Sequence, residues 1–222
     1  MSQPPHSWII VTDFDGTLTE KDIGNELCKL FLPDLYKKLS DDYNGGLLSL
    51  REFQQKMWTH FPCGPDIFAE ASLRMASLRP GVNEFFEACA HKKIPIYIAS
   101  CGIDLYIQKV VERFFSQFAK AALSGVRSNT SKFSSTRLEE ITAPDIDNGQ
   151  PEPFHKGRWA REMGIKHNAK VIAIGNGGSD RTFLGHADMI FATEKLVKIC
   201  EKAGEKFTPF ENFFDILKML PS

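Results

Sequence analysis

The sequence has little that would direct the chain to a membrane or to nucleic acid. Neither end carries a long apolar run, and residues 1–7 are polar, so we expect neither a signal peptide nor a membrane anchor. The net charge is only −1. Because there is no basic surplus to attract phosphate backbones, we expect no nucleic-acid partner.

Cysteine and histidine are too few and too scattered to build a disulfide framework or a zinc site. The five cysteines are odd in number and form no C-x-x-C pair, and the six histidines lack metal-ligand spacing. A reducing compartment is the simplest interpretation, so we expect the protein to be cytoplasmic. The cysteines are Cys28, Cys63, Cys89, Cys101 and Cys200.

What the chain does contain is enough apolar sequence for a sizeable core. Of its 222 residues, 42% are hydrophobic, which fits one large domain or a core with a smaller insertion. Short, nearly continuous apolar runs are typical of strands covered on both faces, and amphipathic helical stripes lie between them. This alternation predicts an α/β fold with a Rossmann-like parallel sheet flanked by helices. The runs span residues 8–12, 94–100, 171–175 and 189–192, and the stripes span residues 82–90, 107–114 and 196–203.

Two segments interrupt this alternation. Residues 20–79 contain no convincing core strand, so we predict a small helical cap inserted after the first strand, with a turn at Pro33. Residues 1–19 and 80–222 would then form the Rossmann-like core. Residues 124–153 are rich in Ser, Thr, Asn, Asp and Pro and are predicted to be loops with short extended pieces. The helical patterns of the cap lie near residues 23–32, 50–61 and 66–77.

The motif D-F-D-G-T-L-T comes directly after the first predicted strand, where ligands gather in a parallel sheet. Asp13 and Asp15 are two residues apart, and Gly16 permits a sharp turn, so both carboxylates can aim at one point. Converging carboxylates repel unless a cation or a shared proton compensates, and Mg²⁺ prefers such oxygen ligands. A D-x-D pair alone is also common in solvated acidic turns.

A second candidate, Ser100-Cys101-Gly102, ends the second apolar run just before a helix predicted near Asp104. The Ser100 hydroxyl and the N–H groups after it can bind a phosphate oxygen, although a helix cap is the alternative interpretation. Cys101 is interpreted as a small filler rather than a nucleophile, because the sequence offers it no evident His partner.

Two later elements complete the set. Lys156 lies near the start of a predicted helix, where a Lys is usually solvated, so its meaning depends on its place in the chain. The turn G-N-G-G-S-D, residues 175–180, ends another apolar run; its glycines allow close backbone approach, and Asp180 can lie beside the same metal. The alternative is a capped glycine-rich turn.

The order of these four elements resembles that of the haloacid dehalogenase-like hydrolase superfamily, and the resemblance covers nearly the whole chain. The inserted helices resemble the type-one cap of its phosphoserine-phosphatase-like branch. A closer resemblance is to the 2-hydroxy-3-keto-5-methylthiopentenyl-1-phosphate phosphatases of methionine salvage. The segments that carry it are T-D-F-D-G-T-L-T, I-P-I-Y-I-A-S-C-G and F-A-T-E-K-L-V-K-I-C-E-K-A-G-E-K-F-T-P-F-E-N-F.

The resemblance implies a Mg²⁺-dependent phosphatase acting on a small phosphorylated metabolite, with Asp13 as nucleophile and Asp15 as general acid/base. Ser100 and Lys156 would hold the transferring oxygens. The implied phosphate-binding residues are Asp13, Phe14, Asp15, Ser100, Cys101, Gly102 and Lys156. The implied metal ligands are Asp13, the Asp15 backbone carbonyl and Asn176, with Asp180 beside them. Candidate substrate contacts from the cap are Asp22, Asn25, Arg51 and Lys56.

Two departures from the family pattern leave alternatives open. Asn176 stands where the family usually has an acid, and P-E-P-F-H-K, ending at Lys156, lacks the cysteines that the methionine-salvage group has just before its Lys. The alternatives are a catalytically weakened phosphate-ester-binding protein, a phosphotransferase, and a phosphoserine-type phosphatase. The oligomeric state, monomer or homodimer, also stays open.

Overall fold

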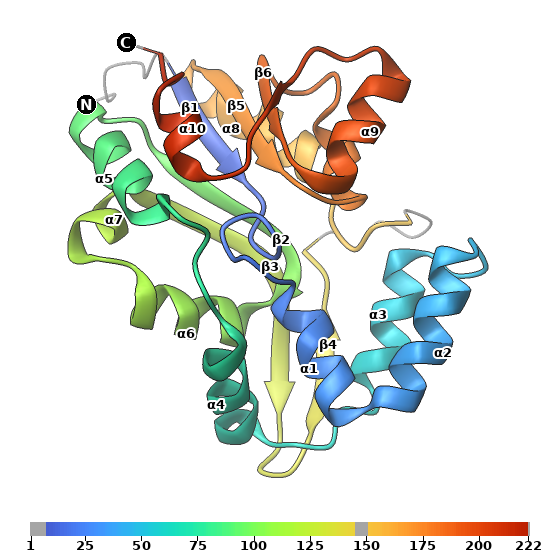
Figure 1. The fold of residues 1–222 in the computed structure, drawn as a ribbon. Coiled ribbons are helices and arrows are strands. Elements are labelled where there is room, and N and C mark those ends of the chain that lie inside the picture. The colour runs from blue at the N-terminus through green and yellow to red at the C-terminus, as the bar shows by residue number, and fades with distance from the viewer. Residues whose placement is uncertain (1–7, 145–150, 222) are drawn as a thin grey trace.

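The computed structural model describes residues 8–144 and 151–221, so the polar N-terminal segment discussed above lies outside the described residues. The described strands form one seven-stranded sheet in the order β4-β3-β2-β1-β5-β6-β7 (Figure 1). Neighbouring strands are parallel except β3 and β4, which are antiparallel. The strands are β1 (Trp8–Thr12), β2 (Ile96–Ile103), β3 (Leu123–Phe133), β4 (Leu138–Thr142), β5 (Lys170–Gly175), β6 (Met189–Ala192) and β7 (Thr208–Pro209).

Helices follow most strands, as an α/β chain requires, and four of them lie between β1 and α5 along the chain. These four, α1 to α4, are called the inserted helices below. The helices are α1 (Ile23–Phe31), α2 (Pro33–Asn44), α3 (Leu50–Trp58), α4 (Pro65–Met75), α5 (Val82–Lys92), α6 (Asp104–Phe114), α7 (Gln117–Ala122), α8 (Lys156–His167), the 3₁₀ helix η1 (Ser179–Phe183), α9 (Glu194–Ala203) and α10 (Phe213–Leu217).

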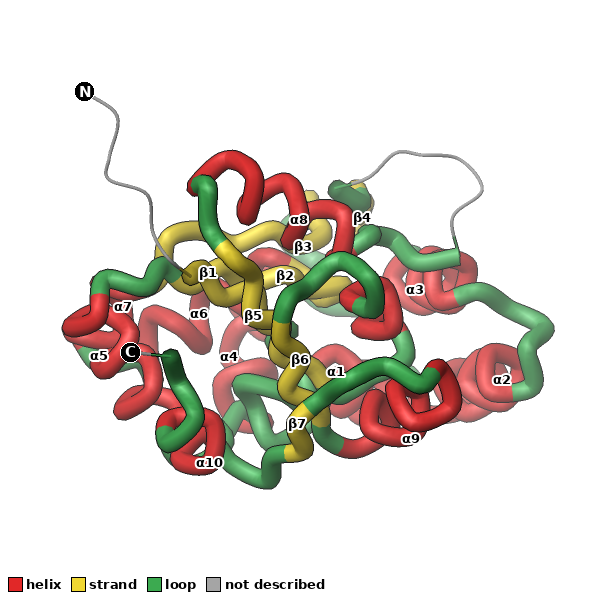
Figure 2. The backbone as a smooth tube through the Cα atoms, turned by 90° about the horizontal axis from the view of Figure 1, so that it is seen from above, coloured by secondary structure: helices red, strands yellow, loops and turns green. Residues whose placement is uncertain are grey.

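The central strands are buried on both faces because their side chains alternate between two apolar layers. Ile10 of β1 packs in one cluster with α5, α6 and α10, whereas Ile9 and Val11 pack in another with α8 and α9. In Figure 2, α8 accordingly lies on the opposite side of the sheet from α5 and α6. This double burial explains the continuous apolar runs of the sequence.

The strand order places the motifs at one point. β1 pairs with β2 on one side and with β5 on the other, so the strand order reverses at β1. In open α/β sheets, ligands bind at such a switch point, outside the carboxyl ends of the strands. The loop after β1, the end of β2 and the turn after β5 therefore meet at the same edge.

The inserted helices begin and end with recognisable caps. The Asp22 side chain accepts a hydrogen bond from the Asn25 N–H at the start of α1, and Ser49 and Glu52 form a capping box at α3. Their buried apolar side chains, including Phe68, join the cluster that covers the α5–α6 face of the sheet. Thr19 and Leu78 pair where the chain leaves for these helices and returns from them.

As predicted, the helical segment that begins at Ile23 ends just before Pro33. Pro33 itself opens α2, because proline is well accommodated at the first helical position, where no N–H partner is needed. Two other sequence expectations need correction. Residues 124–153 are not mainly loops: β3 and β4 occupy much of the described part, and residues 145–150 lie outside the described residues. These strands are polar because they form the exposed end of the sheet. β2 also runs on to Ile103, past its predicted end at residue 100.

Within the described residues, no helix combines the length and the apolar character needed to cross a bilayer.

Candidate active site

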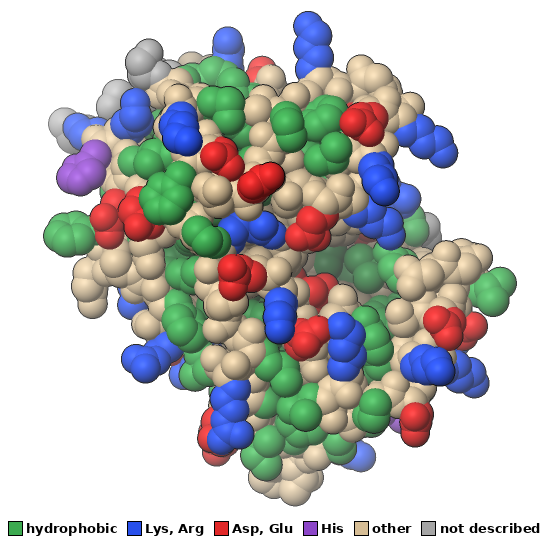
Figure 3. Space-filling model, in the orientation of Figure 1, with side chains coloured by type: hydrophobic (Ala, Val, Ile, Leu, Met, Phe, Trp, Pro, Cys, Tyr) green, Lys and Arg blue, Asp and Glu red, His purple; other side chains and the backbone are tan. Residues whose placement is uncertain are grey.

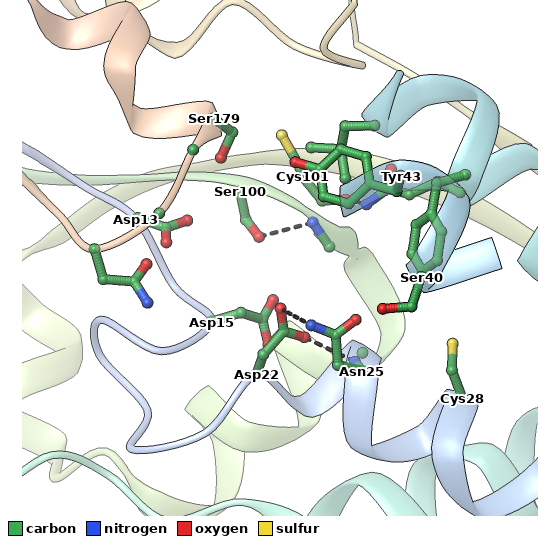
Figure 4. Close-up of a pocket in the computed structure, with 18 of the residues that line it drawn as sticks. Asp13, Asp15, Asp22, Asn25, Cys28, Ser40, Tyr43, Ser100, Cys101 and Ser179 are labelled. Carbon is green, nitrogen blue, oxygen red and sulfur yellow. Dashed lines mark hydrogen bonds between the residues drawn. The ribbon is translucent and has the colours of Figure 1, made fainter. Parts of the chain in front are cut away.

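A pocket of about 310 Å³, lined by both polar and apolar side chains, opens at the switch point, between the sheet and the inserted helices. The face drawn in Figure 3 is hollowed between these two parts of the molecule. In Figure 4, Asp13, Asp15 and Ser100 lie on the sheet side of the pocket, and Asn25, Cys28, Ser40 and Tyr43 face them from the inserted helices. Residues from the sheet and from the inserted helices therefore line one cavity.

The centre of the site is a buried Lys between two buried carboxylates. Lys156 Nζ lies 2.5 Å from Asp13 Oδ1 and 2.7 Å from Asp180 Oδ1, and all three side chains are less than a tenth exposed. Lys156 is the first residue of α8, and the His155 side chain caps this helix by accepting from the Arg158 N–H. The predicted meeting of the first, third and fourth motifs is present in the structure.

Two carboxylates and one ammonium leave this cluster with a surplus negative charge. Burial, followed by the Asp180 carboxylate, raises the pKa of Asp13 to about 7, although Lys156 acts in the opposite direction. Burial alone would lower the pKa of Lys156, but the Asp13 and Asp180 carboxylates raise it, so the ammonium keeps its charge. A further cation would relieve the surplus.

The Thr17 hydroxyl shows that Asp13 and Asn176 converge. Thr17 Oγ1 lies 3.2 Å from Asp13 Oδ2 and also 3.2 Å from Asn176 Oδ1. The Asn176 amide N–H donates to Glu194 Oε2 at 3.0 Å. Because a carboxylate only accepts hydrogen bonds, Glu194 must face the amide nitrogen, which leaves the amide oxygen on the Asp13 side.

These oxygens fit a hard cation. Among the described residues, no three or more His, Cys, Asp or Glu side chains lie close enough together to hold a metal ion by themselves. The donor set would instead be the Asp13 carboxylate, the Asn176 amide oxygen and backbone carbonyls, which suits Mg²⁺ because this ion retains several waters. Asp180 Oδ2 accepts from the N–H groups of Asn176 at 2.9 Å and Gly177 at 2.8 Å, so Asp180 holds the turn that presents Asn176.

Asp15 is held apart from the Lys156 cluster. Its Oδ1 accepts from the Ile23 N–H at 3.0 Å, and its Oδ2 accepts from the Tyr106 hydroxyl. Burial, followed by the Asp22 carboxylate, raises the pKa of Asp15 well above its usual range. An acid with a raised pKa can carry a proton near neutral pH, as a general acid must.

The second motif lies where the pairing between β2 and β3 is irregular. The register between β2 and β3 shifts between Ala99 and Ile103, and the Ser100–Gly102 stretch lines the pocket there. Ser100 Oγ accepts from the Gly102 N–H at 2.9 Å, so its own proton is available to a ligand. The Cys101 carbonyl oxygen accepts from the side-chain amide of Asn129 at 2.6 Å.

One member of the predicted phosphate-binding set, Phe14, lies outside the pocket, and another, Cys101, lines it with an unreactive thiol. The Phe14 side chain is fully buried in the core and does not line the pocket; its backbone N–H instead lies beside the Asp13 carboxylate and lowers the pKa of that group. Cys101 lines the pocket, and burial raises the pKa of its thiol to about 12. A thiol in this state is a poor nucleophile.

The four candidate contacts from the inserted helices divide into two pairs. Asp22 and Asn25 line the pocket. Arg51 and Lys56 are not among the described lining residues: the Arg51 guanidinium donates to the Glu152 carbonyl at 3.0 Å, and the Lys56 side chain is exposed.

Sequence reasoning missed four residues that support the site: Thr17, Arg79, Tyr106 and Glu194. Thr17 lies inside the first motif and could have been found there. Arg79 donates to the carbonyls of Gly16 at 2.6 Å and Thr17 at 3.0 Å and also pairs with Glu194. No local pattern marks the other three, because their partners are distant in sequence.

The chain is similar in sequence to known proteins. The family model described as haloacid dehalogenase-like hydrolase matches residues 10–185. A 2-hydroxy-3-keto-5-methylthiopentenyl-1-phosphate phosphatase of Geobacillus thermodenitrificans is 30% identical, with 96% of this chain and 94% of the relative covered. One from Microcystis aeruginosa is 29% identical, with 96% and 98% covered.

Solved structures show the same fold. A HAD family hydrolase from Salmonella enterica serovar Typhi superposes with a TM-score of 0.76 at 21% identity, with 96% of this chain and 70% of that chain covered. A substrate-bound phosphoserine phosphatase gives a TM-score of 0.74 at 17% identity, with 99% and 100% covered. The predicted α/β architecture is confirmed, and the chain belongs to the haloacid dehalogenase-like hydrolase family.

Proposed function

We propose that this hydrolase is a Mg²⁺-dependent phosphatase that cleaves a small phosphomonoester through an aspartyl-phosphate on Asp13. The observation that carries the proposal is the buried contact of Asp13 with Lys156, 2.5 Å apart, in the wall of the pocket where β1 ends. A carboxylate so placed can attack a phosphorus atom while the Lys156 ammonium offsets its negative charge.

Charge is the main obstacle to such an attack. Two unit negative charges about 4 Å apart repel by ~4 kcal/mol at an effective dielectric of about 20. A barrier of that size slows a reaction by nearly a thousandfold. Lys156 opposes this repulsion directly, and bound Mg²⁺ would neutralise the remaining charge on the phosphoryl oxygens. Asp13, Asn176 and the Asp15 carbonyl would hold the ion, with Asp180 supporting the turn.

The remaining residues then have separate tasks. Asp13 attacks phosphorus, and Asp15 donates a proton to the leaving oxygen and later removes one from the attacking water. The Ser100 hydroxyl, whose proton is not used by Gly102, donates to a phosphoryl oxygen. The inserted helices act as the predicted cap and exclude bulk water during transfer.

The far side of the pocket bears on the substrate. Asn25, Ser40 and Tyr43 offer uncharged polar groups there. Among the described lining residues, the basic side chains are Lys156 and Lys195. This lining favours an uncharged leaving group with hydroxyl or carbonyl groups over one with a second phosphate. A methionine-salvage enol phosphate, the substrate in the names of the relatives, fits this description, and we propose it as the first compound to test.

The test is phosphate release by the purified full-length chain. Asp13→Asn should abolish Mg²⁺-dependent release from p-nitrophenyl phosphate, because an amide cannot form the acyl phosphate. Asp66→Asn, the same change at an exposed position outside the pocket, is the matched control. Full activity of Asp13→Asn would refute the nucleophile. A panel with the enol phosphate, phosphoserine, phosphocholine and thiamine phosphate would then rank substrates.

The alternatives separate in the same assays. A phosphate-ester-binding protein, which the uncharged Asn176 favours, would bind esters without Mg²⁺-stimulated turnover. A phosphotransferase would form new phosphate esters when alcohols are added. The five cysteines, all buried and free, fit the proposed reducing, cytoplasmic location.

A further inference from the structure

We propose that Tyr106 is a positioning residue for the reaction, which holds the Asp15 carboxylate in place for proton transfer to the leaving group. This inference rests on the proposed function, because it assigns Tyr106 a role through Asp15. It concerns a residue of α6 that is separated from the first motif by the whole of the inserted helices.

The first support is that Asp15 has a different donor at each oxygen. Oδ1 accepts from the Ile23 N–H, at the first residue of α1, and Oδ2 accepts from the Tyr106 hydroxyl. Two donors from separate helices fix both the position and the rotation of the carboxylate. A carboxylate held by one donor could still rotate about its terminal bond.

The second support is that the surroundings of Tyr106 are shaped for this contact. Its side chain is 1% exposed, and its ring packs near Phe14 and Phe68, at centroid distances of 6.2 and 6.4 Å. A Cβ atom at Gly102 would lie 1.8 Å from the Tyr106 hydroxyl and 2.7 Å from Asp15 Oδ2. Only glycine at position 102 leaves room for the hydrogen bond, so the second motif helps to build it.

The chemistry of a phenol suits the task. A phenol both donates and accepts hydrogen bonds. Tyr106 can therefore stay bonded to Oδ2 before and after Asp15 releases its proton, and the acid need not reorient between the two half-reactions. A phenylalanine ring would fill the same space and leave Oδ2 without this partner.

The test uses the dependence of the rate on the leaving group. In aryl phosphates, p-nitrophenolate leaves readily without a proton, whereas phenolate and methoxyphenolate need more help from the acid. In the Mg²⁺-loaded enzyme, Tyr106→Phe should lower kcat/KM about tenfold for methoxyphenyl phosphate and less than about threefold for p-nitrophenyl phosphate, the loss expected when one hydrogen bond to the acid disappears.

Tyr97→Phe is the matched control. Tyr97 is also buried, but its hydroxyl bonds to His167 at 2.6 Å and its side chain packs in the cluster on the other face of the sheet. Both variants should lose similar thermal stability, but Tyr97→Phe should leave the leaving-group dependence unchanged. An equal loss of kcat/KM for every aryl phosphate in Tyr106→Phe would overturn the inference, because a purely structural role predicts that result.

Asp15→Asn separates this inference from the proposed function. It should steepen the leaving-group dependence further, and adding Tyr106→Phe to it should change nothing more. A steeper dependence in Asp15→Asn with a wild-type dependence in Tyr106→Phe would refute the role of Tyr106 and leave the phosphatase intact. If Asp15→Asn kept the wild-type leaving-group dependence, Asp15 would not be the general acid. Tyr106 could then have no role through it.

Discussion

Asn176 is the clearest place to test the electrostatics of the site, because it stands where the family pattern has an acid. Its amide N–H donates to Glu194 Oε2 at 3.0 Å. In Asn176→Asp, a carboxylate oxygen would face Glu194 at that distance. The repulsion would be roughly 5 kcal/mol at an effective dielectric of 20 and about 1.4 kcal/mol in bulk water.

The actual repulsion between the two carboxylates should be close to the smaller of these two values. The Glu194 side chain is 52% exposed, and its other oxygen pairs with Arg79 at 3.2 Å. Solvent, rotation and the guanidinium all reduce the penalty. Without metal, Asn176→Asp should therefore lose about 1–2 kcal/mol of unfolding free energy, or ~2–4 °C in Tm per kcal/mol for a chain of this size. With Mg²⁺ the sign should reverse, since a second carboxylate ligand beside Asp13 strengthens cation binding and the bound ion stabilises the folded state.

The assay is urea unfolding of four proteins, in EDTA and in millimolar Mg²⁺: wild type, Asn176→Asp, Glu194→Gln and the double variant. Glu194→Gln should cost little alone but should restore stability to Asn176→Asp in EDTA, because it removes one of the two facing charges. If Glu194→Gln changed both backgrounds equally, the two side chains would not interact and the assigned amide orientation would be refuted.

Three further predictions concern the buried charges and the thiol of the site. Lys156→Met should destabilise the metal-free protein by about 3–5 kcal/mol in urea unfolding at pH 8, because it leaves two buried carboxylates without their cation. Lys170→Met, at an exposed position, is the control and should not destabilise the protein to this extent. Equal losses in the two variants would contradict the buried ion pairs. The pKa of Asp13 is raised to about 7 from 3.8 in the unfolded chain, so its contribution to stability is full below about pH 4 and is lost as the pH rises through about 7. The stability of Asp13→Asn relative to wild type in EDTA should accordingly rise between pH 5 and pH 8, and a constant difference would refute the shift. Burial raises the pKa of Cys101 to about 12, so iodoacetamide at pH 8 should label it slowly although it lines the pocket, and labelling as fast as that of the thiols in the urea-unfolded chain, followed by mass spectrometry, would contradict the raised pKa.

The part of the fold that was predictable from sequence is the part buried on both faces. The runs at β1 and β6 match the strands residue for residue, because a strand covered on both sides has to be apolar throughout. β3 was missed for the opposite reason: its side chains are mostly half-exposed, and its backbone pairing with β2, rather than its composition, makes it a strand.

The residues of the site likewise fall into those that the sequence predicts and those that only the structure reveals. Asp13, Asp15 and the turn at Asn176 were accessible because each directly follows an apolar run, and the ends of neighbouring parallel strands meet. Tyr106 and Glu194 were not accessible, since each acts through a partner that only the folded chain brings near. Nothing in the local pattern around either residue distinguishes it from an ordinary helix position.

Arg79 gives the C-terminal region an influence on the chemistry. Its guanidinium donates to the Glu211 carbonyl at 3.0 Å as well as to the Gly16 and Thr17 carbonyls, and it lies over the Phe210 ring, 5.9 Å from its centroid. One cation thus ties the nucleophile loop to a segment almost two hundred positions further along the chain. Cutting the chain before residue 210 would take away that anchor, and the loop that bears the reactive carboxylate would loosen although no pocket residue had been touched.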